Sequence, residues 1–277
     1  MGTTGNTKSG RRCVRRLNDL DAREWMRFTK SWFVCNPPPR NKDAVLHPAK
    51  FPETMAEDFI RFFTMPGEVV LDPFAGVGST LVAAEACGRR GVGIELSAAF
   101  VDVGRKLLAE GALLIQGDAR NTLDLCRGAG IESVQYVLTS PPYWRMLKTS
   151  RGNVLSAHKE RIRKGLPTDY CGDSADLSSI DKYDEFLAAL VRILADLRSL
   201  LDPGRYLTVV AQNIRIPEGR VCTFAWDLVY ALSGYYTFKG ERLWLQDNKR
   251  LGMWGYPSEF VTNVHHHYCL TFKNDKV

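Results

Sequence analysis

From Phe59 onward, short apolar runs alternate with amphipathic stretches of helical period. Up to residue 139 the predicted elements are strands at 68–71, 91–95, 112–116 and 133–139, with helices at 79–87, 98–109 and 121–128 between them. The pattern resumes with helices at 183–197 and 223–233 and strands at 206–211, 236–245 and 268–272. Such an alternation is typical of a parallel sheet with helices on both faces. The sequence therefore predicts an α/β fold.

Composition excludes several other classes of protein. Of the 277 residues, 45% are hydrophobic and 25% are charged, which is ordinary globular usage. No apolar run approaches the roughly 20 residues that cross a bilayer, and residues 1–16 lack the hydrophobic stretch of a secretory signal. The seven cysteines show no CxxC or Cys/His ligand spacing. We therefore expect a cytoplasmic protein without a structural zinc site.

Positive charge is concentrated in two segments. Residues 1–50 carry a net charge of +7 and residues 144–165 carry +6, whereas the whole chain carries +6. This distribution is typical of a surface that binds a polyanion, although solvated basic tails would give the same counts. Residues 1–44 are predicted to be a basic N-terminal arm, docked by Trp25, Trp32 and Phe33. Residues 45–277 then form one domain with a polar insert at 144–181.

A glycine-containing turn follows the first predicted strand. Its sequence, Asp72-Pro-Phe-Ala-Gly-Val-Gly-Ser-Thr80, lies between a buried strand and a helix, where α/β folds bind nucleotides. The glycines let the backbone approach a ligand, and the free amides of the helix face an anionic group. The turn matches neither the dinucleotide GxGxxG motif nor a P-loop. Asp72 would repel a pyrophosphate and would pair with a ligand that carries an amine or a sulfonium.

Two further acids end the next two predicted strands. Glu95 can accept hydrogen bonds from both hydroxyls of a ribose, and Asp118 can accept one from an adenine amino group. Together with Asp72 they indicate a nucleoside site at the carboxyl edge of the sheet. The alternative is that Glu95 and Asp118 serve only as N-caps of the following helices.

The fourth predicted strand ends in Thr139-Ser-Pro-Pro-Tyr-Trp144. Two adjacent prolines fix the backbone and donate no hydrogen bond, so the carbonyls of Ser140 and Pro141 can both accept from one amine. The serine hydroxyl and the ring of Tyr143 would complete a clamp for a flat group with an exocyclic amine. The alternative is that the prolines only build a rigid turn.

With these two motifs the chain resembles the S-adenosylmethionine-dependent DNA methyltransferases that modify exocyclic amines, cytosine N4 or adenine N6. Asp72–Gly78 is similar to the family's cofactor motif, and Ser140–Tyr143 is similar to its catalytic motif. His47–Pro52 is similar to the tenth motif, and His267–Lys273 is similar to the final strand. The motif order is γ-like. The resemblance covers about residues 45–273 and implies a Rossmann-like, seven-stranded methyltransferase sheet.

The resemblance also implies roles for the residues of these motifs. S-adenosylmethionine is the implied cofactor. The residues implied to bind it are His47, Pro48, Phe51, Asp72, Pro73, Phe74, Gly76, Gly78, Ser79, Thr80, Glu95, Leu96, Asp118 and Ala119. The implied catalytic residues are Ser140, Pro141, Pro142 and Tyr143, with Ser140 and the Pro141 carbonyl holding the amine and Tyr143 stacking on a flipped base. The implied partner is double-stranded DNA, and the residues expected to contact it are Trp144, Arg145, Lys148, Arg151, Lys159, Arg161, Arg163 and Lys164.

Serine at the head of the catalytic motif favours cytosine N4 over adenine N6 within this family, so the expected activity is DNA cytosine-N4 methylation. A 5-methylcytosine enzyme needs a Pro-Cys nucleophile, and the sequence has no Pro-Cys pair. The alternatives are adenine N6 methylation, RNA guanine N2 methylation and a non-catalytic DNA-binding subunit. A homodimer and a cognate restriction endonuclease remain open as partners, and a prokaryotic or phage gene is expected. His265 and His267 share one strand face, where we expect a structural or DNA-facing role and no metal.

Overall fold

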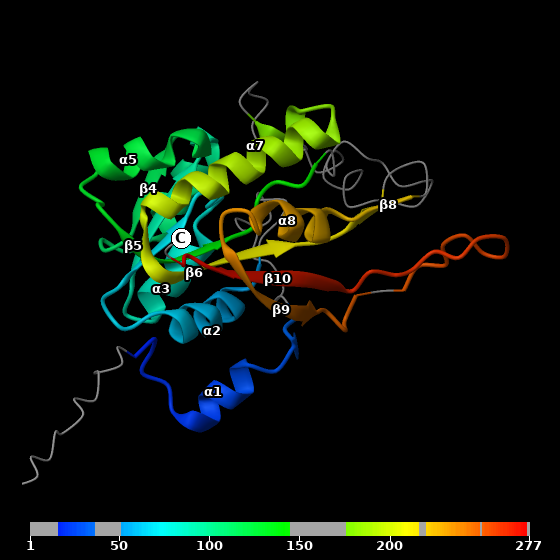
Figure 1. Ribbon diagram of the computed structural model, residues 1–277, viewed down its shortest axis with the longest axis horizontal. Coiled ribbons are helices and arrows are strands. Elements are labelled where there is room, and N and C mark those ends of the chain that lie inside the picture. The colour runs from blue at the N-terminus through cyan, green and yellow to red at the C-terminus, as the bar shows by residue number, and fades with distance from the viewer. Residues whose placement is uncertain (1–15, 37–50, 145–175, 216–219, 250, 276–277) are drawn as a thin grey trace, which may run out of the picture.

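An eight-stranded sheet forms the centre of the molecule (Figure 1). The computed structural model describes residues 16–36, 51–144, 176–215, 220–249 and 251–275. The strand order is β1-β9-β10-β6-β5-β2-β3-β4. The strands are β1 Trp32–Val34, β2 Val69–Asp72, β3 Arg90–Glu95, β4 Leu113–Gln116, β5 Val134–Thr139, β6 Leu201–Ala211, β9 Thr237–Leu245 and β10 His266–Lys273. A separate two-stranded ribbon pairs β7 (Ile214–Arg215) with β8 (Val221–Cys222).

Strands β2 to β6 run parallel, and β10 is antiparallel to both of its neighbours. The predicted α/β fold is confirmed, and every strand predicted from the sequence is present. The predicted count of seven strands is one too few, because β1 pairs in parallel with β9 and adds an edge strand. A strand of three residues is too short to show a periodic pattern in the sequence. Strand β1 therefore forms because β9 offers an edge with which it can pair. Trp32 in this strand is 43% exposed.

Helices cover both faces of the sheet. They are α1 Ala22–Phe28, α2 Glu53–Phe63, α3 Ser79–Ala86, α4 Ala98–Leu107, α5 Thr122–Gly128, α7 Tyr183–Asp196 and α8 Phe224–Leu232. Figure 1 shows α2 and α3 on one face and α5, α7 and α8 on the other, and two separate hydrophobic clusters fill these faces. Helix α2 begins at Glu53, before the alternation of apolar runs and amphipathic stretches that was predicted from Phe59 onward. Six of its side chains are buried. No helix in the described part of the chain is long and apolar enough to cross a membrane.

Residues 16–36 of the predicted arm lie against α2 and β9. Phe28 stacks on Phe62 of α2 with ring centroids 4.0 Å apart, and the ring of Trp25 contacts Phe62 at a tilt of 46° with centroids 4.6 Å apart. The guanidinium of Arg242 in β9 lies 4.0 Å from the ring centroid of Phe28 and 4.5 Å from that of Phe33, so cation–π contacts tie the arm to the sheet.

Two parts of the predicted organisation fall on residues that the structure does not describe. The boundary at residue 44 lies within 37–50, so the division into an arm and a domain stays a prediction. The insert at 144–181 is described only at Trp144 and from Asp176 onward.

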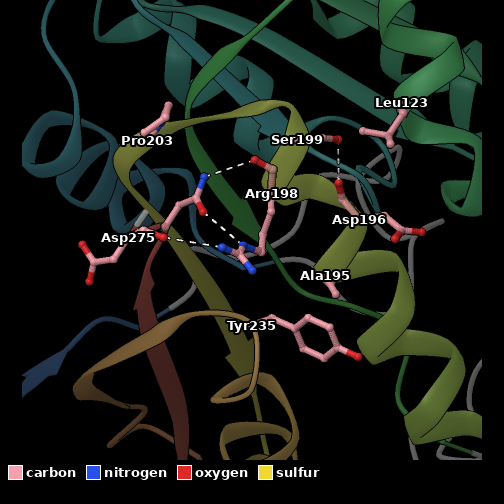
Figure 2. Close-up of a pocket in the computed structure, with 9 residues that line it drawn as sticks. Leu123, Ala195, Asp196, Arg198, Ser199, Pro203, Tyr235 and Asp275 are labelled. Atoms are coloured by element: carbon pink, nitrogen blue, oxygen red, sulfur yellow. Dashed lines mark hydrogen bonds between the residues drawn. The ribbon is translucent and has the colours of Figure 1, made fainter. Parts of the chain in front are cut away.

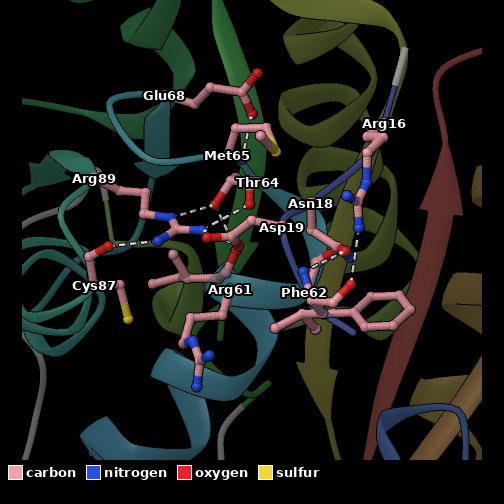
Figure 3. A network of polar contacts seen from close by, with 12 residues as sticks. Arg16, Asn18, Asp19, Arg61, Phe62, Thr64, Met65, Glu68, Cys87 and Arg89 are labelled. Carbon is pink, nitrogen blue, oxygen red and sulfur yellow. Dashed lines mark hydrogen bonds and ion pairs between the residues drawn. The ribbon is translucent and has the colours of Figure 1, made fainter. Parts of the chain in front are cut away.

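A buried arginine joins the end of α2 to the strand that follows α3. Arg89, whose side chain is 4% exposed, donates to the carbonyl of Thr64 at 2.8 Å and to its hydroxyl at 3.0 Å. The same guanidinium lies 3.6 Å from the carboxylate of Asp19, and Asn18 donates to the carbonyl of Phe62 at 2.5 Å (Figure 3). This network therefore anchors the arm to the end of α2.

Replacing Arg89 with alanine should lower the free energy of unfolding by about 3 kcal/mol, because buried carbonyl and hydroxyl acceptors lose their donor. Arg90, the next residue, is exposed and gives a matched control as Arg90→Ala. Chemical denaturation of the two variants measures the difference. Equal unfolding free energies would contradict the role given to this network.

Candidate active site

Asp72 ends β2 and joins three segments of the chain. It is 2% exposed, and one carboxylate oxygen accepts from the Thr139 hydroxyl at 2.6 Å and from the Phe74 N–H at 3.0 Å. The other oxygen accepts from the Thr80 hydroxyl at 2.6 Å. Burial raises the pKa of Asp72 to about 6, although these hydrogen bonds act to lower it. Asp72 therefore fastens the end of β5 to the turn and to the start of α3, instead of presenting its carboxylate to a ligand as predicted.

Thr139 is a residue whose role sequence reasoning missed. Its hydroxyl provides the direct hydrogen bond between the cofactor motif and the catalytic motif, across the parallel pair β2 and β5. The signal in the sequence that could have identified Thr139 is its position at a strand end, directly before Ser140.

Glu95 holds the glycine turn in place. Its two carboxylate oxygens accept from the N–H groups of Gly76 and Ser97, both at 2.8 Å. Gly76 and Gly78 have φ angles of 55° and 88°, in the left-handed region that favours glycine. Each oxygen of Glu95 can accept one more hydrogen bond, which is what two ribose hydroxyls would require.

The acidic surroundings of Glu95 change its protonation. Burial raises the pKa of Glu95 to about 7, the Ser97 and Gly76 N–H groups oppose the rise, and the charges of Asp72 and Asp176 add to it. Asp176, which sequence reasoning also missed, is 6% exposed and caps the short helix η3 (Leu177–Ser179). A cationic ligand would be favoured at this edge.

Asp118 follows β4 and caps the short helix η2 (Ala119–Asn121) by accepting from the Arg120 N–H at 2.9 Å. It also forms an ion pair with the Arg120 guanidinium at 3.2 Å. Asp118 therefore serves as an N-cap, as the alternative interpretation predicted. Its binding to an adenine amino group stays a prediction.

The Ser140–Tyr143 motif continues directly from β5. Tyr143 is 4% exposed, and its ring lies edge-on to Phe224 with centroids 6.0 Å apart. Burial raises the pKa of Tyr143 above its ordinary value, so the hydroxyl stays neutral. The ring does not lie open for stacking on a base, contrary to the expectation from sequence. Trp144 donates from its indole nitrogen to the Ile180 carbonyl at 3.1 Å.

The predicted site residues fall into three groups. The first group lies at the carboxyl ends of β4, β3, β2 and β5, which are neighbours in the sheet in that order. Its members, all partly exposed, are Phe74, Glu95, Leu96, Asp118, Ala119, Ser140, Pro142 and Trp144. Those buried are Phe51, Asp72, Pro73, Gly76, Gly78, Ser79, Thr80, Pro141 and Tyr143. Those outside the described residues are His47, Pro48, Arg145, Lys148, Arg151, Lys159, Arg161, Arg163 and Lys164. The first group forms one continuous edge that a ligand can touch.

His267 lies near the start of β10. Its ring stacks on Trp244 with centroids 4.6 Å apart, and burial lowers its pKa to about 3, so the imidazole is neutral. Among the described residues, no group of three or more His, Cys, Asp or Glu is arranged to hold a metal ion.

A pocket lies at the opposite end of the sheet, where β6 begins and β10 ends (Figure 2). Its lining residues are Leu123, Ala195, Asp196, Arg198, Ser199, Pro203, Tyr235, Asn274 and Asp275. Arg198 there donates to Asn274 Oδ1 at 3.3 Å, and Asn274 donates back to the Arg198 carbonyl at 3.2 Å. These bonds fix the end of the last strand, and none of the predicted site residues lines the pocket.

Residues 12–106 match a family model described as DNA methylase, named N6_N4_Mtase. The chain is 34% identical over 97 residues to Type II methyltransferase M.HinfI of Haemophilus influenzae, covering 34% of this chain and 27% of that protein. It is 32% identical over 78 residues to Type II methyltransferase M.BglII of Bacillus subtilis, covering 28% and 22%. It is 39% identical over 62 residues to DNA adenine methyltransferase YhdJ of Escherichia coli K12, covering 22% and 21%.

The matched part of the chain spans only about a quarter of the length of these relatives. The family match contains the turn at Asp72–Gly78 and Glu95, and it ends before Asp118 and Ser140. It thus contains the glycine turn and Glu95, whose carboxylate accepts from the Gly76 N–H. Residues 12–106 of this chain are therefore similar to the DNA methylase family.

Proposed function

We propose that this chain is a DNA methyltransferase that moves a methyl group from S-adenosylmethionine to the exocyclic amine of a flipped base, with cytosine N4 as the target. One observation carries the proposal. The cofactor turn and the Ser140 motif end two adjacent parallel strands and are joined by the hydrogen bond from Thr139 to Asp72. A ligand on the turn and an amine on Ser140 would therefore be neighbours, which is what group transfer between them needs.

The residues at the edge fit S-adenosylmethionine. Glu95 is partly exposed and has acceptor capacity for two hydroxyls, and Phe74 is partly exposed beside it. The ligand carries a net positive charge, which suits the acidic surroundings of Glu95. When bound, it supplies a methyl group on a sulfonium.

Ser140 and the Pro141 carbonyl would orient the target amine. Two acceptors in one plane take the two amine hydrogens and leave the nitrogen electron pair directed at the methyl group. Transfer would form the new N–C bond at the expense of the S–C bond of the bound ligand, and the amine held by Ser140 would release one proton to solvent. Tyr143 would act as a positioning residue, because its buried ring packs against Phe224 and so fixes the end of the Ser140–Tyr143 segment.

Nucleoside mass spectrometry of a plasmid incubated with protein and S-adenosylmethionine tests the proposal. We expect N4-methylcytosine as the product. Ser140→Ala should reduce the rate at least about tenfold, because it removes a contact to the amine, on which charge develops in the transition state. Unmethylated RNA in a parallel reaction is the control for substrate class. Detection of 5-methylcytosine would overturn the mechanism, and methylation of RNA alone would overturn the choice of substrate.

Adenine N6 is the second candidate target. It is favoured by the similarity of this chain to a relative whose name specifies DNA adenine methyltransferase. The same measurement separates the two targets, since N6-methyladenine would keep the site and change only the base.

A further inference from the structure

The described residues between β9 and β10, 246–249 and 251–265, project beyond the sheet as a finger (Figure 1). Its base is closed by β-type pairing, because the Gln246 N–H donates to the His265 carbonyl at 2.8 Å. The two arms of the finger leave from neighbouring antiparallel strands, with Leu245 paired to His266.

Specific hydrogen bonds build the finger. The Asn263 side chain accepts from the Gly252 N–H at 2.8 Å and donates to the Gly252 carbonyl at 3.0 Å, which clasps one arm to the other. At the turn, the N–H groups of Ser258 and Glu259 both donate to the Gly255 carbonyl. Gly255 has φ +71°, and a Cβ there would lie 2.3 Å from the Glu259 carbonyl oxygen, so only glycine fits.

The ordered finger exposes large apolar side chains. Tyr256 is 77% exposed and Phe260 is 88% exposed, and Leu251 and Met253 are exposed at 79% and 82%. Several exposed apolar side chains on one hydrogen-bonded segment indicate an interaction site, because they contribute nothing to the core. They are too few and too exposed to stabilise the finger itself.

The finger leaves the sheet at the edge that carries the candidate active site. Tyr268 at the start of β10 pairs with Ala211 at the end of β6, and Val209 of β6 pairs with Thr139 at the end of β5. Ser140 follows Thr139, so the clamp and the finger share one edge of the sheet and are separated by β6. A duplex that delivers a base to Ser140 would lie across this edge and would meet the finger.

We propose that Tyr256 and Phe260 insert into the DNA duplex beside the flipped nucleotide and stack on the bases exposed there. The inference rests on the proposed function. By sequence the segment carries acids at Asp247 and Glu259 and bases at Lys249 and Arg250. These charges cancel, so its tip is suited to base stacking more than to phosphate binding. Apolar wedges of this kind unstack a base step and open the duplex. The insertion would lower the cost of flipping the target base.

Methyl transfer to one plasmid in its relaxed and negatively supercoiled forms tests this proposal, using a plasmid that the nucleoside assay shows to be methylated. Negative supercoiling underwinds the duplex and favours unstacking of the bases. The rate of a variant without the wedge should therefore depend on supercoiling. We expect Tyr256→Ala and Phe260→Ala each to lose about tenfold in rate on the relaxed form and clearly less on the supercoiled form. Tyr230→Ala in α8 is the matched control, because Tyr230 is also 88% exposed and should change neither rate.

Each other outcome overturns the inference. An equal loss on both forms, with unchanged thermal unfolding, would mean that the finger contacts DNA without opening it. If neither variant lost rate on either form of the plasmid, the finger would have no role in methyl transfer, and the proposed function would be unaffected. A wild-type dimer in sedimentation that Phe260→Ala converts to monomer would assign the finger to a second copy of the chain. If the wild-type protein binds S-adenosylmethionine but transfers no methyl group to any DNA, the proposed function itself fails.

Discussion

Asp72→Ala is expected to lower the free energy of unfolding by about 3 kcal/mol and to reduce methyl transfer by more than about a hundredfold. Two buried hydroxyls, those of Thr80 and Thr139, would lose their acceptor, and each such loss costs about 1 to 3 kcal/mol. The end of β5 would no longer be fastened to the cofactor turn, so Ser140 would be misplaced relative to the methyl group. Chemical denaturation measures the first effect, and tritium transfer to DNA measures the second.

Two variants control for this result. Asp72→Asn keeps the shape and one acceptor oxygen, so it should lose less stability than Asp72→Ala. Asp124→Ala removes an exposed acid from α5 and should change neither quantity. An Asp72→Ala protein with full transfer activity would show that Asp72 does not couple the two motifs.

The elements predicted correctly were those whose own sequence carries the signal. Strands β2, β3 and β5 are buried apolar runs, and α7 shows one continuous apolar stripe of helical period with buried side chains from Phe186 to Leu194. The elements that were missed depend on distant partners. Helix α1 has no buried residue of its own, and β1 exists only through pairing with β9, about 200 residues away in the sequence.

The candidate site shows the same division. The sequence located the carboxyl edge correctly, because strand ends can be read from apolar runs and turn residues. It could not assign which way each side chain points. Asp72 faces inward because two threonine hydroxyls, 8 and 67 residues away, lie where its oxygens are. Tyr143 is in the core because Phe224, on a helix 81 residues further on, packs against its ring.

Glu95→Gln is expected to weaken the binding of S-adenosylmethionine at pH 8 by between about ten- and a hundredfold, as measured by calorimetry. The amide has only one acceptor oxygen, whereas the carboxylate accepts from Gly76 and Ser97 and would accept from both ribose hydroxyls. Glu132→Gln, at an exposed acid before β5, is the matched control and should bind normally. Unchanged affinity in Glu95→Gln would contradict the assignment of Glu95 to the ribose.

The pH dependence provides a second and independent test of Glu95. Its folded pKa of about 7 lies above the ordinary value of 4.5, so its contribution to stability is fully present below pH 4.5 and is lost as the pH rises through 7, by about 3 kcal/mol. Cofactor binding has the opposite sign, because the hydroxyls bind the ionised form, and affinity should rise with pH up to about 7. Between pH 5 and 8 the wild-type protein should therefore lose stability while gaining affinity. In Glu95→Gln both slopes should become shallower, with the remaining slope in stability due to Asp72, whose pKa of about 6 is also raised. If the affinity of the wild-type protein were constant over this range, the ligand would not be bound through the carboxylate of Glu95.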